Sequence, residues 1–198
     1  MSKRSEIIEI LRQNGPLRVR DLRLRGYSGG YLRKLYQQGI LDRPSRGLYA
    51  LMDDAPSEHR SLLEASRRLP QATICLLSAL RFYDLTTEAP FEVWMAGSRT
   101  TRTPVIDYPA IRLVRMSGDA LQYGLEQADI EGQPVRIFSI AKTLADCFKF
   151  RSQVGLDVAI EALRQAVSEK RVTIDALWQA AAACRQSNVM RPYLEAVV

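Results

Sequence analysis

The sequence contains one motif that serves acyl transfer in penicillin-recognising enzymes. Ser139-Ile140-Ala141-Lys142 matches S-x-x-K, in which a serine at the start of a helix stands beside a lysine that acts as base. The SDN and KTG motifs of those enzymes do not follow, and 198 residues is short for their fold. We therefore predict that Ser139 caps a helix and that Lys142 pairs with Asp146 at i+4. No catalytic residue is predicted.

Three charged residues share one face of the helix expected after Ser139. Lys142, Asp146 and Lys149 follow one another at i, i+4 and i+7, in a segment whose other residues are mainly apolar. The pattern favours a solvated charged face. A second interpretation makes this face a contact surface.

Other polar residues could serve metal or thiol chemistry but do not form a suitable pattern. Asp129 and Glu131 precede a predicted strand and Lys142 follows it, an order that loosely matches a metal-dependent nuclease. That chemistry needs carboxylates that converge on the metal, and this spacing does not favour it. His59, the single histidine, cannot build a typical zinc site. We predict no metal and no cofactor, and we interpret the three widely spaced cysteines as reduced core thiols: Cys75, Cys147 and Cys184.

The net charge of the chain is concentrated in its first quarter. Residues 1–52 carry eleven Lys or Arg and four Asp or Glu, a net charge of +7. The rest of the chain carries 17 basic and 18 acidic residues, a net charge of −1. This asymmetry indicates a polyanion as the partner of the N-terminal segment.

The basic segment has the pattern of a small helical domain that ends in a hairpin. Three apolar stripes at helical spacing predict three helices. The stripes are Ile7, Ile10 and Leu11; Val19, Leu22 and Leu24; and, after an N-cap at Ser28, Leu32 and Leu35. Residues 40–51 then predict two short strands around a turn at 44–47. This order of elements is typical of a winged helix-turn-helix, whose third helix enters the major groove of DNA.

We therefore expect double-stranded DNA as the partner of this segment. Outward side chains of the third helix would read bases, while its N-terminus and the hairpin turn would contact phosphates. The expected contacts are Ser28, Tyr31, Arg33, Lys34, Gln37, Arg43, Ser45 and Arg46. A polar loop at 99–103 provides two further candidate phosphate contacts, Arg99 and Arg102.

The remainder of the chain predicts a larger domain with both helices and strands. A polar break at 53–57 separates it from the basic segment. Residues 74–83 predict a buried helix, and residues 91–138 contain several strand-like segments with a turn at 131–134. From Ser139 onward, four apolar stripes at helical spacing predict a helical layer.

Several stretches of the sequence resemble the AbiEi-type antitoxin family. The similarity is carried by RGLYAL, ICLLSAL, IEGQPVRIFSIAKTLADCFKFR, VGLDVAIEALR and MRPYLEA, which span nearly the whole chain. These proteins are transcriptional regulators of bacterial type IV toxin–antitoxin and abortive-infection systems. The resemblance implies a winged helix that binds inverted repeats in its own promoter and represses the operon. It also implies a C-terminal domain that counteracts a nucleotidyltransferase-like toxin without having to touch it.

Together these observations predict an α+β fold. A winged helix-turn-helix would occupy residues 1–54, and a mixed α/β antitoxin domain with a helical C-terminal layer would occupy 57–198. Under the resemblance, Lys142, Asp146 and Lys149 are a candidate surface for antitoxicity or for contact between the domains. We expect a cytoplasmic repressor and antitoxin in antiviral defence that is not an enzyme and has no membrane segment. It would bind inverted repeats as a dimer or as cooperative monomers.

Two hypotheses from other functional classes stay open. The larger domain would be an enzyme acting on nucleic acid, delivered by the basic winged helix; a convergent cluster of acids would distinguish it. Alternatively, the N-terminal segment would be an adaptor that recognises an acidic protein.

Overall fold

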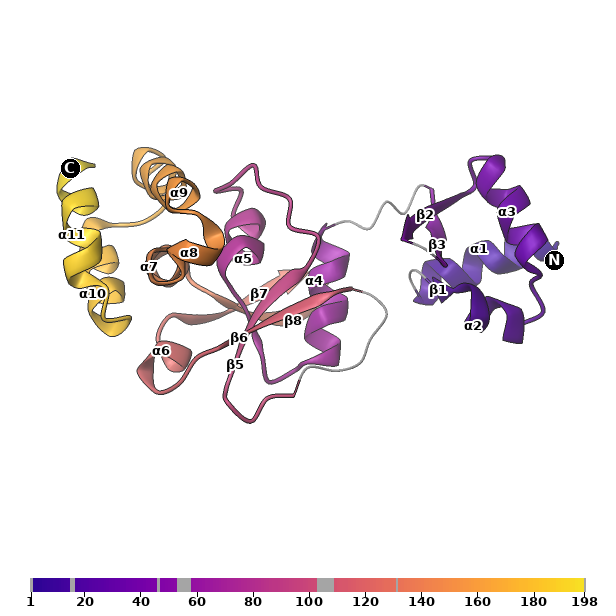
Figure 1. The fold of residues 1–198 in the computed structure, drawn as a ribbon, viewed down its shortest axis with the longest axis horizontal. Coiled ribbons are helices and arrows are strands. Elements are labelled where there is room, and N and C mark those ends of the chain that lie inside the picture. Colours follow the sequence, from indigo (N-terminus) through magenta and orange to yellow (C-terminus); the bar gives the residue numbers. More distant parts are fainter. Residues whose placement is uncertain are drawn as a thin grey trace. The chain divides into compact units, whose positions relative to one another are not determined.

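The computed structural model divides the chain into two compact units, Met1–Glu58 and His59–Val198, which we call unit 1 and unit 2 (Figure 1). The structure describes residues 2–14, 17–45, 47–52, 58–102, 109–130 and 132–197. The polar break predicted at 53–57 lies outside the described residues, as do Arg46 and Glu131. In the described part of the chain, no helix has the length and apolar character needed to cross a membrane.

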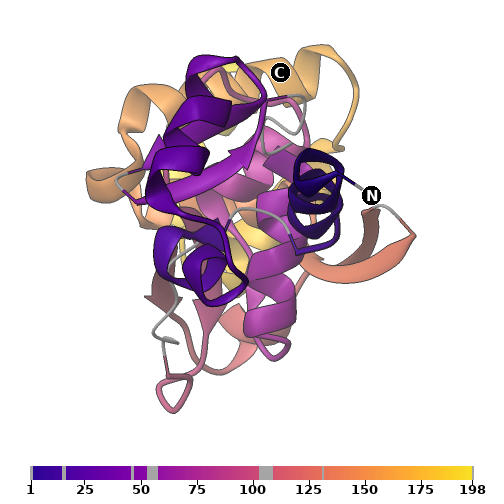
Figure 2. The same ribbon diagram turned by 90° about the vertical axis from the view of Figure 1, so that its right-hand side faces the viewer.

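In its described residues, unit 1 consists of three helices and a three-stranded antiparallel sheet (Figure 2). Its elements are α1 (Lys3–Asn14), β1 (Leu17–Arg18), α2 (Val19–Leu24), α3 (Gly29–Gln37), β2 (Leu41–Ser45) and β3 (Leu48–Leu51). The strand order is β1-β3-β2, so β3 lies in the middle. The sequence predicts the three helices and the β2–β3 hairpin but misses β1, because two residues are too few to show an alternating pattern.

Apolar side chains from all three helices and the sheet form the core of unit 1. Ile7, Leu22, Leu32 and Leu41 are fully buried there. Each side chain of this size stabilises a fold by about 1.5–3 kcal/mol when it is fully buried. Leu24, expected on the inner face of α2, is 88% exposed, because it lies two residues after Leu22 and so on the other side of the helix.

Unit 2 contains a five-stranded mixed sheet with the strand order β6-β5-β4-β8-β7. Its first half contains α4 (Glu58–Arg68), β4 (Thr73–Ile74), α5 (Leu76–Phe82), β5 (Val93–Gly97), β6 (Ile111–Arg115) and α6 (Asp119–Gln122). Its second half contains β7 (Leu125–Ile130), β8 (Gln133–Phe138), α7 (Ile140–Lys149), α8 (Arg151–Val154), α9 (Leu156–Ser168), α10 (Ile174–Ala183) and α11 (Ser187–Ala196). The β4–β8 and β5–β6 pairs are parallel, whereas the β4–β5 and β7–β8 pairs are antiparallel.

The described residues of unit 2 form two hydrophobic clusters. The smaller one joins α4 to the sheet through residues such as Leu62, Met95 and Ile137. The larger one joins the sheet to α5, α7, α9, α10 and α11. Helix α7 lies inside this layer, and every residue from Ala141 to Phe148 is buried. The fold is thus mixed α and β, with a helical layer formed by the C-terminal part of the chain, in agreement with the sequence prediction.

Candidate nucleic-acid interface and a pocket in unit 2

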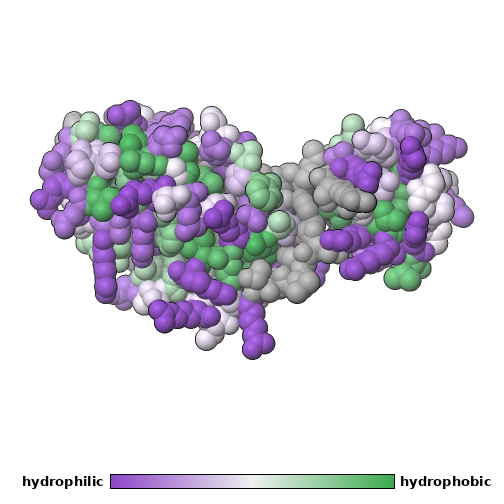
Figure 3. Space-filling view, in the orientation of Figure 1, coloured by the Kyte–Doolittle hydropathy of each residue, from purple (hydrophilic) through white to green (hydrophobic). Residues whose placement is uncertain are grey.

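Helix α3 presents one polar face outward. Leu32 and Leu35 are buried and anchor the helix to the core. Because successive residues of a helix are turned by about 100°, four residues of α3 lie on the face opposite these two leucines. All four are exposed: Gly30, Arg33, Lys34 and Gln37. In the space-filling view, unit 1 exposes mainly hydrophilic residues (Figure 3).

The start of α3 is fixed by a serine cap, as the sequence predicts. Ser28 has extended backbone angles, and its Oγ accepts a hydrogen bond from the backbone N–H of Tyr31 at 3.2 Å. A cap of this kind stabilises a helix by about 1 kcal/mol. Beside this turn lies Arg23 of α2, whose Nη2 would be 3.0 Å from a Cβ atom added to Gly29. A basic side chain of α2 therefore lies beside the start of α3.

Tyr31 packs toward the core and not with the outward residues of α3. Its side chain is half-buried, and its ring stacks on the ring of Tyr27 with centroids 6.4 Å apart and an interplanar angle of 19°. Tyr27 is buried, and burial is the main cause that raises the pKa of its hydroxyl. The predicted role of Tyr31 in reading bases therefore has less geometric support than the roles of Arg33 and Lys34.

The β2–β3 hairpin carries the other predicted contacts of unit 1. Arg43 is exposed, and its backbone N–H donates to Oδ1 of Asp42 at 2.7 Å. The register between β2 and β3 shifts between Asp42 and Ser45. The side chain of Ser45 and the whole of Arg46 lie outside the described residues, so their predicted contacts stay predictions.

The loop after β5 carries Arg99 and Arg102, both of which are exposed. The hydroxyl of Ser98 lies 2.9 Å from that of Thr100 and 3.1 Å from that of Thr101. Arg115 of β6 holds the loop by donating to the backbone carbonyls of Ser98, at 2.8 Å, and Thr101. Arg99 and Arg102 therefore stay candidate phosphate contacts on a loop that Arg115 and the paired hydroxyls hold in place.

The Lys142–Asp146 pair lies in the core of unit 2 and not on its surface. Both side chains are 0% exposed, and Nζ of Lys142 donates to Oδ2 of Asp146. The predicted i,i+4 pairing is confirmed, but a solvated face and a contact surface are both wrong for these two residues. The reason is that α5, α9 and α10 pack around α7 and cover this face. Lys149, at the end of the same helix, is exposed.

Two further groups contact this buried ion pair, a thiol and an aromatic ring. The Sγ of Cys184 donates to Oδ1 of Asp146 at 3.5 Å, and Nζ of Lys142 lies 4.5 Å from the centre of the Phe138 ring. Burial raises the pKa of Asp146, and Lys142 opposes this effect. Burial also raises the pKa of Cys184 to about 11. The cluster therefore forms a structural pair in a low-dielectric interior.

Ser139 and Lys142 are not arranged as a nucleophile and its base. The Oγ of Ser139 accepts the backbone N–H of Lys142 at 3.3 Å and caps α7, as predicted. An activated serine needs the lysine amine within hydrogen-bond reach of its hydroxyl. Here the amine of Lys142 bonds to Asp146.

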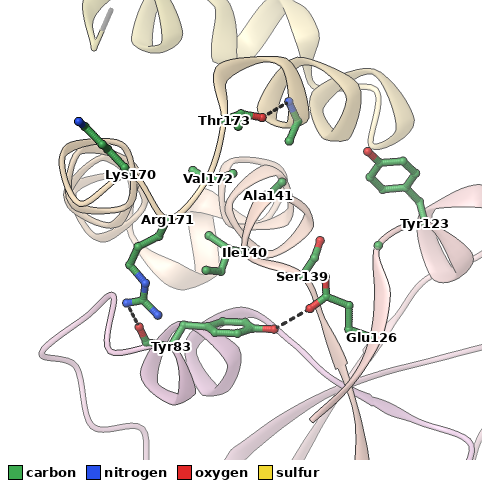
Figure 4. A pocket seen from close by; sticks show the side chains of 12 residues that line it. Tyr83, Tyr123, Glu126, Ser139, Ile140, Ala141, Lys170, Arg171, Val172 and Thr173 are labelled. Carbon is green, nitrogen blue, oxygen red and sulfur yellow. Dashed lines mark hydrogen bonds between the residues drawn. The ribbon is translucent and has the colours of Figure 1, made fainter.

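A pocket of about 430 Å³ opens beside Ser139 (Figure 4). Its polar lining residues are Tyr83, Tyr123, Glu126, Ser139, Lys170, Arg171 and Thr173. The hydroxyl of Tyr83 lies 3.0 Å from the carbonyl oxygen of Phe138 and 3.3 Å from Oε2 of Glu126. Arg171 donates to the backbone carbonyl of Tyr83, and the amine of Lys170 is turned away from the pocket. The charged groups of this pocket are therefore engaged with the protein or directed outward.

The pocket could not be predicted from the sequence. Tyr83 and Arg171 are 88 residues apart, and no spacing pattern links them. Asp129, considered above as a metal ligand, accepts the backbone N–H of Gly132 at 3.0 Å and so stabilises the β7–β8 turn. Within the described ranges, no three His, Cys, Asp or Glu residues are grouped so that they could hold a metal ion.

The comparisons with known proteins relate to unit 1 by sequence and to both units by fold. Residues 5–51 match the model of a family described as transcriptional regulator, AbiEi antitoxin. This match confirms the family resemblance over unit 1. Among solved structures, the crystal structure of the RV2827C protein from Mycobacterium tuberculosis is similar with a TM-score of 0.52 and 15% identity, over 98% of this chain and 79% of that chain. At this identity the similarity concerns the fold. No curated protein matches the chain.

Proposed function

We propose that the protein is a sequence-specific DNA-binding repressor and the antitoxin of a type IV toxin–antitoxin system. The observation that carries this proposal is the basic, outward face of α3 in a unit that matches a regulator family over residues 5–51. Unit 1 would be a winged helix-turn-helix. Its element order supports this assignment: three helices are followed by the β2–β3 hairpin, and β1, between α1 and α2, pairs with β3.

Helix α3 would enter the major groove as the recognition helix. Arg33 and Lys34 are suited to the acceptors of guanine, and Gln37 to the paired donor and acceptor of adenine. Arg43, on the hairpin, would contact the backbone and position the unit without reading sequence. In this arrangement affinity falls linearly with salt on a log–log scale, with a slope of about −0.9 per phosphate contacted.

Unit 2 would act by binding and not by catalysis. The hydrogen bond of the Lys142 amine to Asp146 supports this part of the proposal, as does the hydrogen bond of Arg171, in the pocket beside Ser139, to the carbonyl of Tyr83. The unit would counteract a nucleotidyltransferase-like toxin. Two copies of the protein would occupy the two halves of an inverted repeat, because a single recognition helix reads few bases.

The proposal is tested by fluorescence anisotropy with the full-length protein at about 150 mM salt, where non-specific binding is weak. One duplex carries the DNA upstream of the protein's own gene, and a scrambled duplex of equal length is the control. We expect a preference of about a thousandfold or more for the upstream duplex. Equal affinity for the two duplexes would overturn the proposed function.

A further inference from the structure

Gly30 occupies the most outward position in the first turn of α3. It shares the exposed face with Arg33, Lys34 and Gln37, opposite the buried Leu32 and Leu35. A glycine in the first turn of a helix usually has a local reason, such as a left-handed backbone or a close neighbour.

The fold of unit 1 supplies neither reason for a glycine at position 30. The residue lies within α3 and does not have a positive φ, and a Cβ atom added there would meet no atom of the described residues within 4 Å. The adjacent Gly29 differs, because its Cβ would lie 3.0 Å from Nη2 of Arg23. Alanine is the better helix former at either position. The glycine at position 30 therefore lowers the helix propensity of α3, and no contact with the described residues requires it.

The charges around Gly30 indicate what approaches it. Helix α3 contains no acidic residue, whereas the first turns of α1 and α2 carry Glu6 and Asp21. An acid in a first turn normally stabilises a helix. Its absence from α3, together with Arg33 and Lys34 on the same face, leaves a bare and positively charged surface. Such a surface fits a polyanion that comes into direct contact with the helix backbone.

We propose that Gly30 marks the closest approach of α3 to DNA, where the absence of a side chain lets the helix lie deep in the major groove. The inference rests on the proposed function and adds a position that determines the depth of docking. The major groove is about 12 Å wide and a helix with side chains measures about 10–12 Å across, so one side chain on the inner face matters. A methyl group at Gly30 would hold Arg33, Lys34 and Gln37 away from the base edges.

The test compares Gly30→Ala with Gly29→Ala in the full-length protein. Both substitutions raise helix propensity, but the methyl group at position 29 meets the flexible end of Arg23 instead of the outward face. Thermal unfolding followed by circular dichroism should show that Gly30→Ala is at least as stable as wild type. Affinity for the upstream duplex should fall at least about tenfold for Gly30→Ala, and less than about threefold for Gly29→Ala.

The possible results separate this inference from the proposed function. If wild type prefers the upstream duplex and Gly30→Ala binds it equally well, the inference is wrong while the proposed function stands. If Gly30→Ala unfolds at a lower temperature than wild type, the fold itself needs this glycine and the inference is overturned. If wild type shows no preference between duplexes, both are overturned.

Discussion

Removal of the Asp146 carboxylate should strongly destabilise unit 2. In Asp146→Ala, the ammonium group of Lys142 would stay in a site where both side chains are now 0% exposed, without its counter-charge. Breaking a buried ion pair in this way costs about 3–5 kcal/mol. The contact of Lys142 with the Phe138 ring at 4.5 Å remains and offsets part of this cost. We therefore expect a loss of about 3 kcal/mol in the free energy of unfolding.

Tryptophan fluorescence during urea unfolding measures this loss in unit 2 directly. The two tryptophans of the chain, Trp94 and Trp178, both belong to this unit. Lys149→Ala is the matched control, because it removes an exposed charge from the same helix and should change stability by less than about 0.5 kcal/mol. The double variant Lys142→Met with Asp146→Leu should recover most of the loss, since a hydrophobic pair replaces the ion pair. Equal stability of Asp146→Ala and Lys149→Ala would refute the burial of this pair.

Two further predictions concern the same region. Because burial raises the pKa of Cys184 from 9.0 to about 11, its thiol binds a proton more tightly in the folded state. Stability should therefore fall as the pH rises from 9 to 11, and urea titrations should show a smaller decrease for Cys184→Ser; an equal decrease would contradict the assignment. Gly124→Ala should cost more unfolding free energy than Gly132→Ala. Both glycines have positive φ, but a Cβ at Gly124 would lie 2.6 Å from Cβ of Lys142, whereas one at Gly132 meets no described atom within 4 Å. Equal losses in urea unfolding would contradict this close packing.

Local signals in the sequence predict much of unit 1. Ser28 is followed by apolar residues at helical spacing, and the structure places it as the cap of α3. Leu32 and Leu35 mark the inner face of that helix and, by elimination, its outward face. The two-residue strand β1 is missed because its pairing with β3 is a tertiary contact.

The charged residues of α7 show where such reasoning fails. The spacing of Lys142 and Asp146 predicts their pairing, but it does not say whether the face they share meets water or another helix. The residues of α7 divide into an apolar face and a face with Lys142, Asp146 and Lys149, which is the ordinary pattern of an amphipathic surface helix. The packing of other helices against the charged face is a tertiary contact that this pattern does not reveal. The Sγ of Cys184, which contacts Asp146 from 38 residues away, could not be inferred from spacing.

The most direct test of the DNA-binding account removes two positive charges from α3. Arg33→Ala with Lys34→Ala is compared with Lys149→Ala with Arg164→Ala, which removes the same charge from exposed positions of unit 2. The measurement is the anisotropy of the upstream and scrambled duplexes with each full-length variant. We predict that the α3 variant loses about a hundredfold or more in affinity for the upstream duplex, together with its preference for that duplex, while the control retains both. Equal losses in the two variants would show that net charge, and not the face of α3, controls binding, and would contradict the account.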